Sequence, residues 1–183
     1  MLTLQQIIGE ADLLVPNTVS TPDKVTQLNA INQDFFNAVK IPKVSRFTAV
    51  LGQADYILPA DVREKNIDLV ECGLLKYRGL MSEDVSPTQN NWSYDDTTNT
   101  LTLSPAPYRN GLPGIVRYHR LATTTFVSGN LTAQPDAPAE YHWTYVAALC
   151  AWLALTQDDA SKAALYEGQY KSAWNVAAQN YQK

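Results

Sequence analysis

The sequence is poor in charged residues, and this shortage argues against one class of protein. Only 17% of the 183 residues are charged, against about 25% in an average globular chain, and the net charge is −4. A protein that holds nucleic acid by neutralising phosphates needs a basic face, which this composition does not favour. Low charge together with ten Tyr and four Trp indicates a surface that partly faces other proteins.

Cysteine and histidine are also scarce, with two residues of each kind. Cys72 and Cys150 lie in apolar segments without CxxC spacing, so we expect free buried thiols and a reducing compartment. Neither His119 nor His142 has a second ligand at the spacing that a metal site needs. The motifs GxSxG, GxxxxGK[ST] and GxGxxG are missing, so serine hydrolase and nucleotide-binding chemistry have no support. We therefore expect no catalytic, cofactor-binding or metal-binding residue.

Long apolar runs are missing as well. The longest one, Tyr145 to Leu155, is too short for a membrane span, which needs about 20 residues. The N-terminus has neither a basic start nor a small-residue cleavage site, so no secretion signal is expected. These features predict a protein without a membrane partner.

The first 45 residues are predicted to form two helices. Thr3 and Gln6 have the spacing of a capping box, and apolar residues follow at helical intervals. The second helix is predicted to begin at Thr21-Pro22-Asp23, with Thr21 as the cap, and to end at Ile41-Pro42. Asn32 interrupts its apolar stripe, which predicts a local hydrogen bond or a device that sets register.

From residue 46 to residue 133 the pattern changes to short segments that alternate apolar with polar residues. Glycines and prolines separate these segments, as is typical of strands and turns. Trp92-Ser93-Tyr94 and Thr100 to Leu103 flank a polar loop and predict a hairpin. We expect a small antiparallel sheet or sandwich. The predicted strands include residues 46–50, 55–58, 66–72, 100–103 and 115–119.

Residues 134–183 are predicted to form two more helices, separated at Gln157-Asp158-Asp159. The first is apolar on nearly every face from Tyr145 onward, and such a helix must be covered on all sides; we expect other subunits, or the protein on which they dock, to bury most of this helical pair. The last helix carries aromatic side chains along one side. They are a candidate partner-binding surface, with packing inside the helical body as the alternative. These residues are Tyr166, Tyr170, Trp174 and Tyr181.

The predicted fold class is therefore α+β. A helical bundle forms from the N-terminal residues 1–45 and the C-terminal residues 134–183, and a small antiparallel β domain, residues 46–133, is inserted between them.

Charged clusters give little support to a catalytic site or a nucleic-acid face. The acidic pairs have turn-like or cap-like contexts, so we expect solvated loop and cap roles rather than a glycosidase site. The arginines near the last predicted strand are interspersed with acids and do not form a basic face. The pairs are Glu83-Asp84, Asp95-Asp96 and Asp158-Asp159, and the arginines are Arg109, Arg117 and Arg120.

Four stretches, in this order along the chain, resemble tailed-bacteriophage head-to-tail adaptor proteins. Residues 28–33 (LNAINQ) resemble an N-terminal helix of that family. Residues 50–61 (VLGQADYILPAD) are similar to its strand and turn. Residues 101–107 (LTLSPAP) and 114–118 (GIVRY) are similar to its hairpin and the following strand. Residues 138–142 (PAEYH), an alanine-rich helix and Asp158-Asp159 are similar to its C-terminal helical pair.

The resemblance implies a structural virion protein that is not an enzyme and needs no cofactor. It implies a ring, generally of twelve copies, that docks under the portal and extends the DNA channel. The ring would receive the tail, nozzle or stopper protein, and DNA would pass through without sequence-specific binding during genome ejection. The expected location is the virion neck or tail, with assembly in the host cytoplasm.

Two alternatives stay open. One is another tail completion or tube-joining protein with the same architecture. The other is a carbohydrate-binding or hydrolytic β domain that would use Trp92, Tyr94, Asp95 and Asp96.

Overall fold

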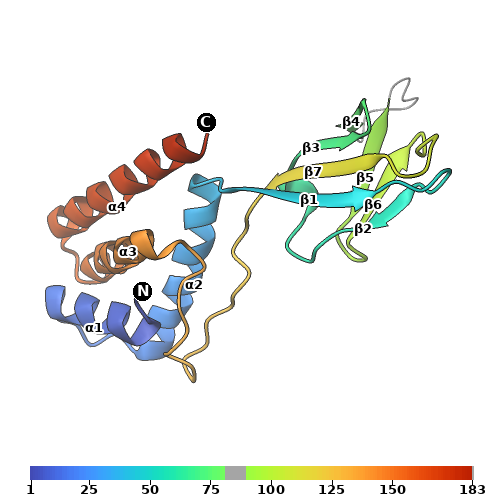
Figure 1. Ribbon diagram of the computed structural model, residues 1–183. Coiled ribbons are helices and arrows are strands. Elements are labelled where there is room, and N and C mark those ends of the chain that lie inside the picture. The colour runs from blue at the N-terminus through green and yellow to red at the C-terminus, as the bar shows by residue number, and fades with distance from the viewer. Residues whose placement is uncertain (81–89, 183) are drawn as a thin grey trace. The chain divides into compact units, whose positions relative to one another are not determined.

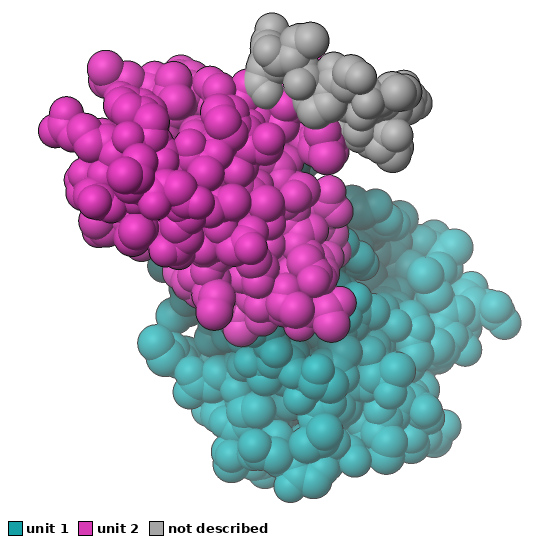
Figure 2. Space-filling model, turned by 90° about the vertical axis from the view of Figure 1, so that its right-hand side faces the viewer, with its two compact units in different colours: residues 1–40, 121–183 teal, residues 41–120 magenta. Residues whose placement is uncertain are grey.

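The computed structural model describes residues 1–80 and 90–182 and has four α-helices and a seven-stranded sheet within that range (Figure 1). The expected α+β class is confirmed. The chain forms two compact units, coloured separately in Figure 2. We call residues 1–40 and 121–183 the helical unit and residues 41–120 the β unit.

Both boundaries of the units differ from the expected ones, because residues 41–45 lie in the β unit and residues 121–133 lie in the helical unit. The backbone N–H of Leu4 donates to the carbonyl of Ala133 at 2.9 Å. The side-chain amide of Asn29 bonds both backbone groups of Phe126, at 2.9 and 2.7 Å. This threonine-rich segment resembles a strand in sequence, yet it is an extended strap held by side chains.

The two N-terminal helices begin with side-chain caps. Helix α1 spans Leu4–Leu14, and the predicted capping box of Thr3 and Gln6 is present. Helix α2 spans Thr21–Ala38, but its cap is Ser20 and not Thr21 as predicted. Ser20 has the extended backbone of a cap, and its hydroxyl accepts a hydrogen bond from the Asp23 N–H at 3.3 Å.

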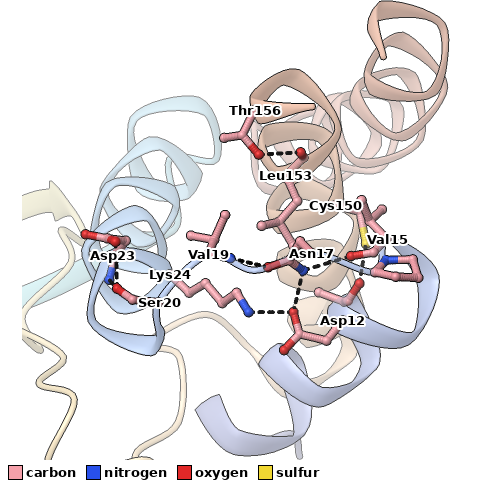
Figure 3. A network of polar contacts seen from close by, with 12 residues as sticks. Asp12, Val15, Asn17, Val19, Ser20, Asp23, Lys24, Cys150, Leu153 and Thr156 are labelled. Carbon is pink, nitrogen blue, oxygen red and sulfur yellow. Dashed lines mark hydrogen bonds and ion pairs between the residues drawn. The ribbon is translucent and has the colours of Figure 1, made fainter. Parts of the chain in front are cut away.

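A polar network fixes the turn between α1 and α2 (Figure 3). The carboxylate of Asp12 accepts hydrogen bonds from the Asn17 amide at 2.8 Å and from the Lys24 ammonium at 2.7 Å. Lys24 is only 4% exposed, so loss of Asp12 would leave a buried cation without its ion pair. The Asn17 carbonyl oxygen also accepts from the Val19 N–H at 3.0 Å, which orients the entry to α2.

Helix α3 spans His142–Thr156 after a 3-10 turn at Ala139–Tyr141, and α4 spans Ala160–Tyr181. Helix α3 packs against α1, α2 and α4 (Figure 1). Most of its residues are buried by these helices of the same chain, including Tyr145 and Leu149. The expectation that other subunits cover this helix is therefore wrong, because three helices of its own unit already surround it.

Asn32 of α2 holds distant parts of the helical unit together. Its amide nitrogen donates to the Asp136 carboxylate at 2.9 Å, and its carbonyl oxygen accepts from the Tyr145 hydroxyl at 2.8 Å. The Asp136 carboxylate also accepts from the N–H groups of Thr123 and Thr124, both at 2.8 Å. The predicted polar role is present, but it is long-range and not local as we expected. It ties the strap to α2 and α3.

The β unit forms one seven-stranded sheet in the order β1-β7-β3-β4-β5-β6-β2. All neighbours are antiparallel except β4 and β5, which are parallel. The expected all-antiparallel sheet is thus corrected to a mixed one. The strands are β1 Pro42–Thr48, β2 Asp55–Ile57, β3 Ile67–Cys72, β4 Leu75–Gly79, β5 Asn91–Asp95, β6 Thr100–Ser104 and β7 Pro113–His119, with a 3-10 turn at Glu64–Asn66.

The missed strand β4 explains this correction. Leu75 and Tyr77 point to the interior while Lys76 is exposed, so the alternation was present in the sequence. Gly73, with φ of +61°, allows the tight β3–β4 turn that a residue with a side chain would strain. Because β4 was not among the predicted strands, its parallel pairing with β5 could not be anticipated.

The sheet curls so that its two edge strands approach each other. The ring centroids of Phe47 on β1 and Tyr56 on β2 lie 4.3 Å apart, although these strands stand at opposite ends of the sheet order. Phe47 pairs with Gly114 across β1 and β7, and a Cβ at Gly114 would lie 2.3 Å from the Phe47 ring. Glycine is required here for the close approach of that ring.

Candidate protein-docking surface

A groove runs between α2, α3 and α4 of the helical unit, with a volume of about 160 Å³. Its floor is apolar and its rim carries two carboxylates. We call it the helical groove. The floor includes Ile31, Ala148, Ala151 and Trp152, and the rim includes Asp34, Leu155 and Glu167.

Trp174, one of the four predicted partner-binding aromatics, is a buried residue that lines this groove from the core side. Its side chain is 6% exposed, and its ring packs edge-on against Phe35 with centroids 5.6 Å apart. The indole N–H donates to the Thr144 hydroxyl at 2.9 Å, so its polar atom is already satisfied within the chain. This geometry gives Trp174 a packing role in the helical unit.

The three predicted tyrosines are half-buried and differ in position. Tyr170 packs on Trp174 at 4.8 Å between centroids and lines the helical groove with it. Burial raises the pKa of the Tyr170 and Tyr166 hydroxyls, and the nearby Cys150 thiol adds to the effect at Tyr166. Tyr166 and Tyr181 are not among the groove residues. The structure therefore brings together only two of the four predicted residues at this site.

The exposed apolar side chains of α4 lie on its other side. Leu165 is 60% exposed and Val176 is 56% exposed. The helix has only three charged residues, and Glu167 pairs with Lys171 while Lys162 donates to the Leu14 carbonyl at 2.9 Å. Sequence reasoning missed this side because it followed the larger aromatic rings, although helical spacing alone separates the two faces.

The histidines have structural partners. His142 is buried, accepts the Leu2 N–H at 3.0 Å and contacts the Ala137 carbonyl at 2.9 Å. His119 lies 3.3 Å from Asp68. Among residues 1–80 and 90–182, no three His, Cys, Asp or Glu side chains lie together in a way that could hold a metal ion.

The predicted acidic pairs mainly organise loops. Asp95 accepts hydrogen bonds from the Thr97 N–H and the Thr98 hydroxyl, at 2.8 and 2.9 Å, and these bonds lower the pKa of its carboxyl. Asp96 accepts from the Glu64 N–H at 3.0 Å. Asp159 caps α4. The pair Glu83-Asp84 lies outside the described residues.

The carbohydrate-binding alternative requires exposed aromatic rings in the β unit. Trp92 and Tyr94 belong to the buried core of the β unit, and the Tyr94 hydroxyl donates to the Val62 carbonyl at 3.2 Å. A sugar ring stacks on an exposed aromatic face, which neither residue offers. The alternative in which Trp92 and Tyr94 stack on a sugar is therefore wrong.

The cysteines behave as predicted, and both are free and buried. Burial raises the pKa of the Cys150 thiol to about 11 and also raises that of Cys72, so neither is a poised nucleophile. Within the described part of the chain, no helix is both long and apolar enough to cross a membrane.

Most of the predicted site residues thus have packing or loop roles. A sequence model of the family described as SU10 adaptor protein matches residues 2–183. The chain belongs to the SU10 adaptor protein family. This confirms the resemblance to bacteriophage adaptors and extends it over nearly every residue. A search of curated protein sequences found no match. As an adaptor of this family, the chain is a structural bacteriophage protein.

Proposed function

We propose that this protein is the head-to-tail adaptor of a tailed bacteriophage. In this proposal it forms a ring, generally of twelve copies, docks under the portal, extends the DNA channel and receives the tail, nozzle or stopper protein. The observation that carries the proposal is the match to an adaptor family over residues 2–183. The ring is assembled in the host cytoplasm and stays in the virion neck, where it acts during genome ejection.

The proposed architecture is a helical bundle, built from the two ends of the chain, with an inserted β domain. Such a bundle presents α4 as a long surface helix. Tyr166, Tyr170 and Tyr181 are half-exposed on it, with Trp174 behind them as support. Aromatic rings with one apolar and one wet side are common anchors at protein interfaces. We propose that these tyrosines contact the portal or a neighbouring subunit.

A channel wall must let DNA slide. The net charge of −4 is compatible with a lining that does not bind phosphates tightly. In this role the protein has no enzymatic activity and no cofactor, and DNA passes through without sequence-specific contacts.

The test is co-sedimentation of the purified chain with the portal of the same phage. The proposal predicts a ring-on-ring complex in the electron microscope. A chain that stays unbound at micromolar concentration contradicts it. A complex that forms only with tail-tube protein, and never with portal, would instead support the tube-joining alternative.

A further inference from the structure

The outward face of strands β1 and β7 carries two exposed arginines. On these strands Ser45 and Phe47 pair with the buried Val116 and with Gly114, so they belong to the core side. The alternate residues point the other way. We call these four residues the basic sheet face: Val44 and Arg46 on β1, and Ile115 and Arg117 on β7.

The two arginines are close enough to act on one anionic group. Arg46 lies opposite Ile115, and Val44 lies opposite Arg117, which makes the arginines diagonal neighbours. Such neighbours are typically about 7–8 Å apart, within reach of long side chains. Neither guanidinium has a hydrogen bond or ion pair to any residue in the described ranges 1–80 and 90–182. Glu71 of β3 lies opposite Ile115 on the same face, but its carboxylate is paired with the Lys76 ammonium at 3.7 Å. Two neighbouring arginines without an ion pair of their own favour a partner that supplies a carboxylate or phosphate.

The aliphatic residues on this face favour a protein partner over DNA. Val44 is 42% exposed. Two further aliphatic side chains are half-buried: Ile115, which lies opposite Glu71, and Leu69, which lies opposite Arg117. Arginine interleaved with aliphatic side chains is typical of protein interfaces. A phosphate-binding face relies on positive charge in excess, whereas the β unit has nine basic and nine acidic residues.

The helical groove has the complementary character. Asp34 on its rim is exposed, and its carboxylate has no hydrogen-bond or ion-pair partner among the described residues. The floor beside it is apolar. The helical unit as a whole has nine acidic residues against five lysines and no arginine. The groove thus combines an unpaired carboxylate and an apolar floor in a unit of net negative charge. These properties complement the arginines and aliphatic side chains of the basic sheet face.

We infer that the basic sheet face of one copy docks on the helical groove of a second copy, with Arg46 and Arg117 binding the carboxylate of Asp34. This inference rests on the proposed ring and specifies the contact that closes it. A cyclic ring needs a heterologous interface, in which two different surfaces of the same chain join. The basic sheet face and the helical groove are two such surfaces.

Charge reversal tests the contact. The variants Arg46→Glu/Arg117→Glu and Asp34→Lys each place like charges across the interface. Each should raise the concentration for half-assembly, measured by sedimentation velocity, by about tenfold or more. The matched controls are Arg109→Glu and Glu10→Lys, exposed charges outside both surfaces, which should assemble as the wild type does.

Mixing the two reversed variants provides the decisive arm. The Arg46→Glu/Arg117→Glu variant has an acidic sheet face. Only the groove of the Asp34→Lys variant offers this face an opposite charge. At the next interface around the ring, the wild-type sheet face meets the wild-type groove. The mixture should therefore regain assembly as an alternating ring, although each variant alone does not. Structural damage from either set of substitutions would not be repaired by mixing.

The other outcomes separate the claims. Reversed variants that assemble normally, or that fail and are not rescued by mixing, overturn this contact while leaving the ring in place. Normal assembly with lost retention of duplex DNA would assign the face to nucleic acid instead. A wild type that forms no ring at low salt, either alone or with the portal, overturns the ring itself. If circular dichroism shows that a reversed variant is unfolded, Arg46→Gln/Arg117→Gln replaces it, and its assembly should lose the salt sensitivity of the wild type.

Discussion

The two units of this protein divide its charges unequally. All six arginines lie in the β unit, whereas the helical unit carries nine acidic residues and only five lysines. The overall net charge of −4 is therefore the charge of the helical unit alone. A composition that looks uniformly poor in charge thus describes two units of different charge, and the proposed head-to-tail ring would join two different surfaces of this kind.

The units also differ in how they hold themselves together. The helical unit packs α3 inside three other helices and pins an irregular strap with buried polar groups. The β unit closes a curled sheet around an aromatic core. Substitutions that damage one unit should therefore leave the other folded.

The largest effect is expected from Trp174→Ala in the helical unit. Removing a buried indole costs about 3–5 kcal/mol of unfolding free energy, and it leaves the Thr144 hydroxyl without its donor. Chemical denaturation followed by circular dichroism measures the loss. Val176→Ala, on the exposed side of α4, is the control and should change stability by less than about 0.5 kcal/mol. Full stability of the Trp174 variant with lost assembly would contradict its packing role.

In the β unit, Gly114→Ala should destabilise by about 1–3 kcal/mol, because the new Cβ collides with the Phe47 ring and overpacks the core. Gly9→Ala in α1 is the opposite case. Nothing lies within 4 Å of a Cβ there, so alanine should stabilise the helix by about 0.5–1 kcal/mol. Thermal unfolding of both variants measures these changes in stability. Equal changes would contradict a collision between the new Cβ and the Phe47 ring. Adding Phe47→Leu to the Gly114 variant should restore part of its stability.

The strap predicts a pH effect that is confined to the helical unit. Burial alone would raise the pKa of the Asp136 carboxyl, but its hydrogen bonds from Thr124, Asn32 and Thr123 outweigh burial and hold that pKa below its ordinary value. The folded state thus favours the carboxylate. Its stabilisation is present above the unfolded pKa of about 3.9 and is lost as the pH falls through the folded value.

Denaturation curves between about pH 6 and pH 2.5 test this effect, since the range extends from above the unfolded pKa of about 3.9 to well below it. The wild type should lose stability over the acidic end of that range more steeply than Asp136→Asn. Parallel curves for the two proteins would show that the carboxylate contributes nothing to the strap.

The smallest effect is the thiol reactivity of the two cysteines, each of which reports on the opening of one unit. Cys72 lies in the β unit and Cys150 in the helical unit, and both are buried with raised thiol pKa values. At about pH 8 a thiol reagent should modify each only when its own unit opens. Mass spectrometry of modification against denaturant therefore follows the units one by one. Rapid labelling of both cysteines in the native protein would contradict their burial.

The sequence predicts elements better than it predicts what connects them. The capping box of Thr3 and Gln6 and the recapping at Asp159 depend on near neighbours, so local spacing revealed them. The strap of residues 121–133 and the contacts of Asn32 depend on partners far along the chain. Local patterns carry no information on such partners.

The candidate site shows the same limit. Helical spacing groups Tyr166, Tyr170, Trp174 and Tyr181 along one side of α4, but it cannot tell that α2 and α3 bury part of that side. The basic sheet face was equally hidden, because Arg46 and Arg117 are far apart in sequence and become diagonal neighbours only through the pairing of β1 with β7.

The central claim is that this chain is the adaptor ring between portal and tail. Cryo-electron microscopy of intact particles tests it most directly, with the chain located by fitting its two units separately into the neck density. We expect a ring of copies in the layer directly below the portal, around the DNA channel. Finding the chain only in a more distal tail layer, or not in the particle at all, would contradict the claim.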